Sequence, residues 1–143
     1  MTTSKLNSLE QSQTYAQQFA EELSSSKHDT VILFYAEMGA GKTTLIAELG
    51  RALGMQERIT SPTFIGMNEY HNSDMSFYHY DLYQVGISLE DFAEILEQDG
   101  HKVIAIEWAE NLDEAVLQLI KNKANLIKIK IDLDGETRVV TRT

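Results

Sequence analysis

The sequence contains no cysteine, which excludes disulfide bonds, thiolate metal ligands and a cysteine nucleophile. It also lacks any apolar run that approaches the roughly 20 residues of a membrane-spanning helix. Residues 1–7 have no apolar segment of the kind that a signal peptide requires. We therefore expect no association with a membrane, and the lack of cysteine fits a reducing compartment.

Basic residues are also scarce. Lys and Arg number 12 against 22 Asp and Glu, which gives a formal net charge of −10. This balance argues against tight non-specific binding of nucleic acid by the chain alone. The charge is uneven, because six of the 12 basic residues lie from Lys121 onward with only three of the 22 acids. This tail is either a solvated face or a basic edge that meets an acidic partner or RNA.

Apolar periodicity divides the chain into alternating helical and extended segments. The segment Ser8-Leu9-Glu10-Gln11 is typical of a helix N-terminus, and the apolar residues Tyr15, Phe19 and Leu23 follow it four apart. The other predicted helices span residues 42–49, 88–96 and 111–120. The predicted strands span residues 30–36, 63–70, 76–82, 103–106, 127–133 and 137–141.

A glycine-containing turn joins the first of these strands to a helix. Residues 36–43 read Ala-Glu-Met-Gly-Ala-Gly-Lys-Thr and follow the apolar run 31–35. Backbone N–H groups of residues 39–43 can converge there on anionic oxygens, and the positive end of the helix dipole points at the same place. Lys42 adds a positive charge for the outer phosphates, and the Thr43 hydroxyl can bind Mg²⁺. The turn therefore predicts a nucleoside triphosphate site.

The nucleotide-binding residues predicted from this turn are its small residues, the lysine and the two threonines. They are Gly39, Ala40, Gly41, Lys42, Thr43 and Thr44. The usual pattern begins with glycine, whereas Ala36 occupies that position here, so the chain must turn there in a conformation that an L-residue tolerates. The alternative interpretation is an ordinary strand-to-helix turn with an exposed lysine.

Strands that alternate with helices, with hairpins inserted, predict an α/β fold. We expect one domain of residues 1–143, built as a P-loop NTPase-like sandwich with a mixed, mainly parallel central sheet and antiparallel edge hairpins. In such folds ligands bind beyond the carboxyl ends of the strands. The turn at residues 36–43 and Glu107 both lie at such ends.

Two carboxylates are candidates to complete a hydrolytic site. Glu107 follows the apolar run 103–106, where an acidic residue can support Mg²⁺. Strand alternation places His79, Asp81 and Tyr83 on one face, so Asp81 can hold water or the metal shell with His79 as its partner. The alternatives are a surface glutamate and an edge strand with a solvated face.

Two further residues have less decisive positions. Thr63 lies at a loop-to-strand junction, where a threonine can sense a γ-phosphate or simply begin a strand. Trp108, the only tryptophan, is either a hydrophobic anchor at the end of a strand or a wall of the nucleotide site.

Five segments together resemble the TsaE (YjeE) family, small bacterial P-loop ATPases of tRNA threonylcarbamoyladenosine synthesis. The resemblance lies in their order and spacing and covers most of the chain. The segments are Gly39-Ala40-Gly41-Lys42-Thr43-Thr44, Ser61-Pro62-Thr63-Phe64, Asn68-Glu69-Tyr70, His79-Tyr80-Asp81-Leu82-Tyr83 and Glu107-Trp108.

The resemblance implies a cytoplasmic, Mg²⁺-dependent ATPase that binds ATP and ADP and acts with the proteins TsaD and TsaB. Those partners transfer a threonylcarbamoyl group to an adenosine beside the anticodon, so tRNA is at most an indirect partner of this chain. By motif match, Lys42 and Thr43 take the phosphate and Mg²⁺ roles, Glu107 is the second metal ligand, and Asp81 supports hydrolysis. The match also makes Trp108 a neighbour of the nucleotide.

The chain departs from the family pattern at two positions. Ala36 stands where the family usually has glycine, and Gln84 stands where an arginine usually follows the tyrosine. The loss of that cation weakens either a phosphate contact or a partner contact. Arg138 is a candidate to replace it.

Two other functions use the same kind of turn. A small-molecule kinase needs a cationic lid, whereas only four arginines occur and residues 86–100 are acidic. A non-hydrolysing nucleotide switch would bind ATP without turnover, and the presence of Lys42, Thr43, Asp81 and Glu107 argues against it.

Overall fold

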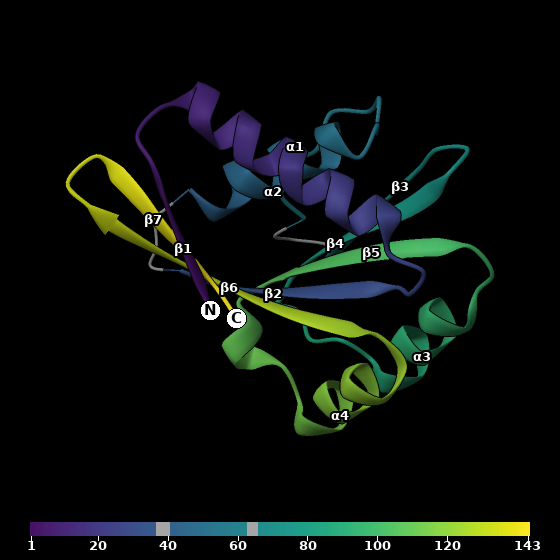
Figure 1. Ribbon diagram of the computed structural model, residues 1–143. Coiled ribbons are helices and arrows are strands. Elements are labelled where there is room, and N and C mark those ends of the chain that lie inside the picture. Colours follow the sequence, from purple (N-terminus) through teal and green to yellow (C-terminus); the bar gives the residue numbers. More distant parts are fainter. Residues whose placement is uncertain (37–40, 63–65) are drawn as a thin grey trace.

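The computed structural model describes residues 1–36, 41–62 and 66–143, which form an α/β fold (Figure 1). The described helices are α1 (Leu9–Ser25), α2 (Lys42–Ala52), α3 (Leu89–Glu97) and α4 (Glu114–Lys123), with a short 3₁₀ helix at Ala109–Asn111. The described strands are β1 (Thr2–Leu6), β2 (Thr30–Ala36), β3 (Met67–His71), β4 (Met75–Asp81), β5 (His101–Glu107), β6 (Asn125–Asp134) and β7 (Thr137–Arg142).

All seven strands join one mixed sheet in the order β1-β7-β6-β2-β5-β4-β3. The four central strands β6, β2, β5 and β4 are parallel, and the pairs β3–β4, β6–β7 and β1–β7 are antiparallel. Both predicted hairpins are therefore confirmed, at opposite sides of the sheet. The prediction that residues 1–143 form one domain stays a prediction.

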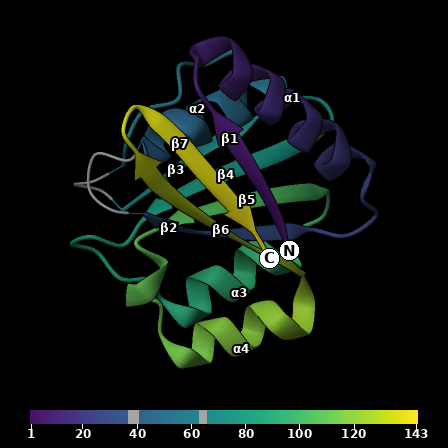
Figure 2. The same ribbon diagram turned by 60° about the vertical axis from the view of Figure 1, so that its left-hand side comes forward.

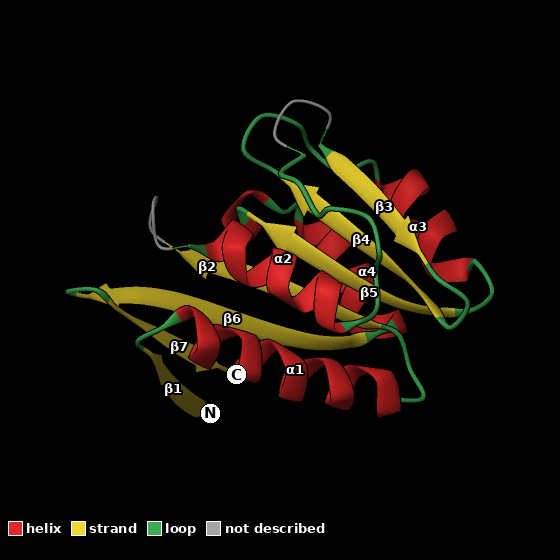
Figure 3. Cartoon of the chain, turned by 90° about the horizontal axis from the view of Figure 1, so that it is seen from above, coloured by secondary structure: helices red, strands yellow, loops and turns green. Residues whose placement is uncertain are grey.

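Helices cover both faces of the sheet. Helices α1 and α2 lie on one face, and α3 and α4 lie on the other (Figures 1 and 3). Strand alternation in β2 divides the core accordingly, because Ile32 and Phe34 pack on the α1–α2 face whereas Val31 and Leu33 pack on the α3–α4 face. None of the described helices combines the length and apolarity needed to cross a bilayer.

Strand β1 was not predicted. It lies at the edge of the sheet beside β7, so that the two chain termini come close together (Figure 2). Its sequence Thr-Thr-Ser-Lys-Leu carries a single buried apolar residue, Leu6, and therefore shows no apolar alternation. The strand forms through backbone pairing with β7, which lies at the other end of the sequence.

Most predicted elements differ from the observed ones by a few residues at their ends, and two of the differences have a clear local cause. The edge strand expected from residue 63 begins at Met67, since Gly66 has a φ of +86° that no strand adopts, and residues 63–65 lie outside the described residues. The helix expected at residues 111–120 begins only at Glu114, because Leu112 is extended and Asp113 is the N-cap of α4.

Candidate functional site

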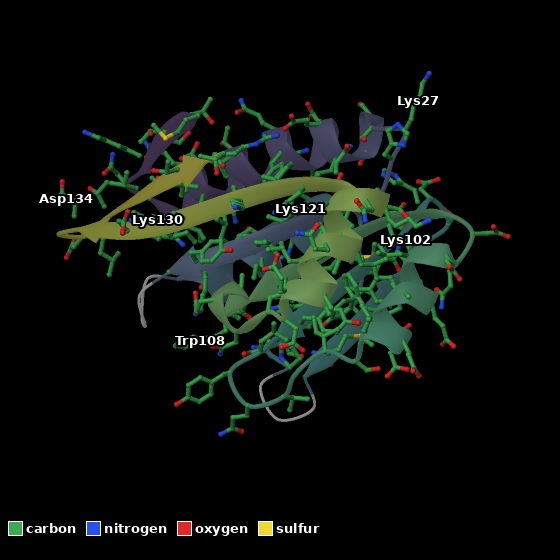
Figure 4. The ribbon with its side chains drawn as sticks, turned by 90° about the horizontal axis from the view of Figure 1, so that it is seen from below. Lys27, Lys102, Trp108, Lys121, Lys130 and Asp134 are labelled. Atoms are coloured by element: carbon green, nitrogen blue, oxygen red, sulfur yellow. The ribbon has the colours of Figure 1, made fainter. Side chains whose placement is uncertain are left out.

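The predicted site residues come from three parallel strands and one helix. Strands β2, β5 and β4 are neighbours, so their carboxyl ends meet at one edge of the sheet, and α2 begins just beyond the end of β2. Figure 4 shows Trp108 at this edge, beyond the end of β5, with Lys102 at the opposite end of that strand. The fold therefore places the site where ligands of parallel sheets bind.

Glu107 connects α2 with β4. Its Oε1 accepts a hydrogen bond of 2.8 Å from the hydroxyl of Thr43, the second residue of α2. Its Oε2 lies 2.5 Å from Nε2 of His79 on β4. The side chain of Glu107 is 2% exposed and that of His79 is fully buried. A buried carboxylate held on both oxygens has a fixed orientation.

The structure gives His79 a different partner from the one predicted. We expected it to assist Asp81, whereas its imidazole bonds Glu107. The cause is strand register: β4 and β5 are parallel neighbours that pair Asp81 with Glu107 and His79 with Ala105. This pairing brings His79 of β4 beside Glu107 at the end of β5. The apolar patterns of the two strands do not predict that the strands are neighbours.

Asp81 lies at the end of β4 and is 4% exposed. One of its carboxylate oxygens, Oδ1, accepts a hydrogen bond of 3.0 Å from the backbone N–H of Tyr83. As predicted, Tyr80 and Leu82 face away from it into the core beneath α3 and α4. Asp81 is thus fixed at the same edge of the sheet as Glu107, beside it in the strand register.

Lys42 and Trp108 lie together at the start of α2. The Lys42 ammonium nitrogen lies 4.1 Å from the centroid of the indole ring, and Tyr83 packs on the same indole at 5.0 Å between centroids. Nζ is buried and has no hydrogen-bond acceptor among the described residues. A buried cation without an acceptor fits an anionic ligand, because a phosphate oxygen would supply the missing partner.

Arg138 reaches the same place from β7. Its Nη1 donates to the carbonyl of Gly41 at 3.3 Å, and its Nη2 donates to the hydroxyl of Ser12 on α1. Gly41 is the N-cap of α2 and has a φ of +81°, in the left-handed region that favours glycine. The structure therefore places Arg138 beside the predicted phosphate loop, where sequence reasoning offered it as a candidate.

Ser12 was missed by the sequence reasoning. It is a fully buried polar residue in the apolar stripe of α1, four residues before Ala16. Its place in the apolar stripe could have indicated a role, because a hydroxyl that faces the core of the protein needs a hydrogen-bond partner. Thr44 is the third residue of α2 and is exposed, and its predicted role in nucleotide binding stays a prediction. The predicted residues Gly39, Ala40 and Thr63 lie outside the described residues.

The chemistry of these groups suits a divalent cation bound together with a phosphate. The Thr43 hydroxyl and the Glu107 carboxylate are the oxygen ligands that Mg²⁺ prefers, and they lie within 2.8 Å of each other. The described residues contain no group of three or more His, Asp or Glu side chains that could hold a metal. A Mg²⁺ ion at this place would complete its shell with phosphate oxygens and water, as it usually does.

Comparison with known proteins identifies the family. The model of the family "Threonylcarbamoyl adenosine biosynthesis protein TsaE" matches residues 6–140. The chain is similar to the tRNA threonylcarbamoyladenosine biosynthesis protein TsaE of Rickettsia typhi, with 31% identity over 87% of this chain and 92% of that protein. It is 37% identical to the protein of the same name from Synechocystis, over 70% of this chain.

The extent of these similarities differs. The Synechocystis match spans 65% of that protein's length, slightly less than two thirds. The fold is similar to that in the crystal structure of Bacillus subtilis YdiB, with a TM-score of 0.68 and 24% identity over 99% of this chain and 83% of that one. The family model matches most of the chain, and we conclude that the chain belongs to the TsaE family.

Proposed function

We propose that this protein is a Mg²⁺-dependent ATPase that supports the threonylcarbamoyladenosine modification of tRNA. In this proposal the turn at residues 36–43 is a P-loop and the fold is a P-loop NTPase-like sandwich. The observation that carries it is the convergence of three groups at the N-terminus of α2: the buried ammonium of Lys42, the hydroxyl of Thr43 and the carboxylate of Glu107. The names of the relatives supply the pathway.

Each residue has a defined task in this proposal. Lys42 leaves the indole face to bind the outer phosphates, while the N–H groups at the start of α2 bind the same anion. Thr43 and Glu107 hold Mg²⁺, which supplies charge neutralisation for the transferring phosphoryl group. Asp81 orients water from the end of β4, and Trp108 forms a wall of the nucleotide site.

The partners are part of the same proposal. We expect the ATPase to act with TsaD and TsaB in the cytoplasm and to support turnover of that assembly. Any contact with tRNA is local, since the chain carries a net charge of −10 and its basic residues gather after residue 120. Intrinsic hydrolysis is expected to be slow in the absence of the partners.

The deciding experiment measures ATP hydrolysis with and without the TsaD–TsaB pair. We expect stimulation by the pair, and we expect Lys42→Ala and Glu107→Ala to abolish it. Lys27→Ala is the matched control, because this exposed lysine lies between α1 and β2, at the opposite end of β2 from the site and outside the basic C-terminal segment. Nucleotide binding without hydrolysis under every condition would instead indicate a switch module, and labelled phosphate on a small acceptor would indicate a kinase.

A second variant separates binding from hydrolysis. Asp81→Asn keeps the shape of the side chain and an oxygen acceptor for the Tyr83 N–H. We expect nucleotide affinity to stay within about threefold and hydrolysis to fall by about 10²-fold or more, as is typical when a proton-accepting or water-orienting group is lost. If nucleotide binding collapses instead, Asp81 has a structural role and its proposed task is wrong.

A further inference from the structure

We propose that His79 is a positioning residue for Glu107, and that its Nε2–H fixes the carboxylate in the orientation that presents Oε1 to the Thr43 hydroxyl. This inference rests on the proposed function, in which Thr43 and Glu107 are the magnesium ligands. His79 belongs to β4 and touches neither phosphate nor metal in this arrangement. Its effect on the site passes entirely through Glu107.

The geometry carries the inference. Glu107 uses one oxygen for His79 at 2.5 Å and the other for Thr43 at 2.8 Å, so its two oxygens are held by two different elements. The side chains of both His79 and Glu107 are at most 2% exposed, so water does not compete for these bonds. A carboxylate bonded only by Thr43 could rotate about its own side-chain torsions. The imidazole removes that freedom.

The surroundings of Nδ1 determine which of the two ring nitrogens of His79 carries the hydrogen. Nδ1 is buried and has no hydrogen-bond partner within the part of the chain that the structure describes. A buried N–H without an acceptor is costly, whereas the contact of Nε2 with a carboxylate oxygen requires a hydrogen between them. The ring is therefore the Nε2–H tautomer, which donates to Glu107.

This arrangement matches a general property of metal sites. Side chains that hydrogen-bond a ligand fix its orientation, and their loss typically lowers metal affinity by about 10- to 100-fold. His79 is the described side chain that bonds the Glu107 oxygen turned away from Thr43. It was predicted as an assistant of Asp81, and the structure assigns it to the other carboxylate.

Two amide variants test the inference. The amide nitrogen of glutamine takes approximately the place of Nε2, whereas that of asparagine takes approximately the place of Nδ1. We expect His79→Asn to raise the Mg²⁺ concentration for half-maximal Mg–ADP binding by about tenfold or more, and His79→Gln to stay within about threefold of the unaltered chain. ADP binding in the presence of a chelator should change in neither variant.

Controls separate positioning from stability. His71→Asn alters an exposed histidine of β3 that bonds Ser76 and Glu69, and it should leave the Mg²⁺ requirement unchanged. A purely structural role of His79 would lower Tm in both amide variants and shift the Mg²⁺ requirement in neither, or in both alike. Either pattern overturns the inference.

A measurement on the unaltered chain keeps the inference testable if a variant does not fold. Nitrogen-15 labelling of the four histidines reports the tautomer of each ring. We expect the Nε2–H tautomer for His79 both with and without Mg–ADP, and the Nδ1–H tautomer would overturn the inference. If the unaltered chain shows no Mg²⁺-dependent ADP binding, the proposed function fails as well. Normal Mg²⁺-dependent binding with an unaffected His79→Asn variant refutes this inference alone.

Discussion

At the scale of single residues, the contact between the ammonium group of Lys42 and the indole of Trp108 should make the tryptophan fluorescence sensitive to ligand binding. The ammonium nitrogen lies 4.1 Å from the ring centroid of Trp108, the only tryptophan of the chain. Phosphate binding would draw Nζ off the ring, because a charge-assisted hydrogen bond is stronger than a cation–π contact at a partly exposed indole. We predict that Mg–ADP changes the tryptophan emission.

The variant Lys42→Met tests this prediction because it keeps the length of the side chain and removes the charge. It should abolish the emission change and weaken ADP binding by about tenfold or more, the loss expected for one charge-assisted bond. Lys121→Met is the control. An undiminished emission change in Lys42→Met would show that the signal does not come from the ammonium group.

Thr43 allows a second prediction at this scale. Thr43→Val preserves the shape of the side chain and removes the hydroxyl that donates to Glu107, whereas Thr43→Ser preserves the hydroxyl. We predict that the valine variant binds ADP with equal affinity in Mg²⁺ and in chelator, while the serine variant keeps its preference for Mg²⁺. Calorimetric titration measures both affinities. An unchanged Mg²⁺ preference in Thr43→Val would refute the role of this hydroxyl as a ligand.

The residues of the site were predictable to different degrees. The meeting of Lys42, Thr43 and Glu107 at one edge of the sheet could be predicted because each has a characteristic place, after a strand or at the start of a helix. The bond between His79 and Glu107 could not, because the two residues are 28 positions apart and meet only through the pairing of β4 with β5. Sequence patterns define the face of a strand but not the neighbour of that strand.

At the scale of secondary-structure elements, the junction before α2 depends on one glycine. Gly41 has a φ of +81°, and a Cβ at this position would lie 2.8 Å from Nη1 of Arg138. We predict that Gly41→Ala lowers the free energy of unfolding by about 1–2 kcal/mol through backbone strain. Urea titration provides the measurement.

A double variant distinguishes strain from the clash. The arginine tip can move aside, so most of the cost should persist when Gly41→Ala is combined with Arg138→Ala. If the arginine variant restores the stability of Gly41→Ala, the contact and not the backbone is responsible. Gly86→Ala is the matched control, because a Cβ there meets no atom within 4 Å.

The elements that the sequence predicted are those with a periodic apolar pattern. Strand β2 has the predicted bounds Thr30–Ala36, because every residue of its central part is buried and apolar. Strand β1 has no such pattern, and its pairing with β7 is a contact between distant parts of the sequence. The 3₁₀ turn at Ala109–Asn111 was also missed, since three residues are too few to show a helical period.

At the scale of the whole molecule, one ion pair connects the first helix with the last strand. Arg142 of β7 donates two hydrogen bonds to the carboxylate of Glu22 on α1, at 2.5 and 2.8 Å. These bonds hold the pKa of the Glu22 carboxyl below its ordinary value of 4.5, and they raise the pKa of the Arg142 guanidinium. The stability of the folded chain therefore depends on pH in the acidic range through this pair.

The sign of this effect follows from the lowered pKa. The contribution of Glu22 to stability is fully present above pH 4.5 and disappears as the pH falls through its lower folded-state pKa. We predict that Glu22→Gln lowers Tm at pH 7 by no more than about 4 °C, since the pair is partly exposed, and that the difference vanishes in strong acid. The neighbouring Glu21→Gln is the control. If the Tm difference between Glu22→Gln and the unaltered chain is the same at neutral and strongly acidic pH, the Glu22–Arg142 pair does not contribute to the pH dependence of stability.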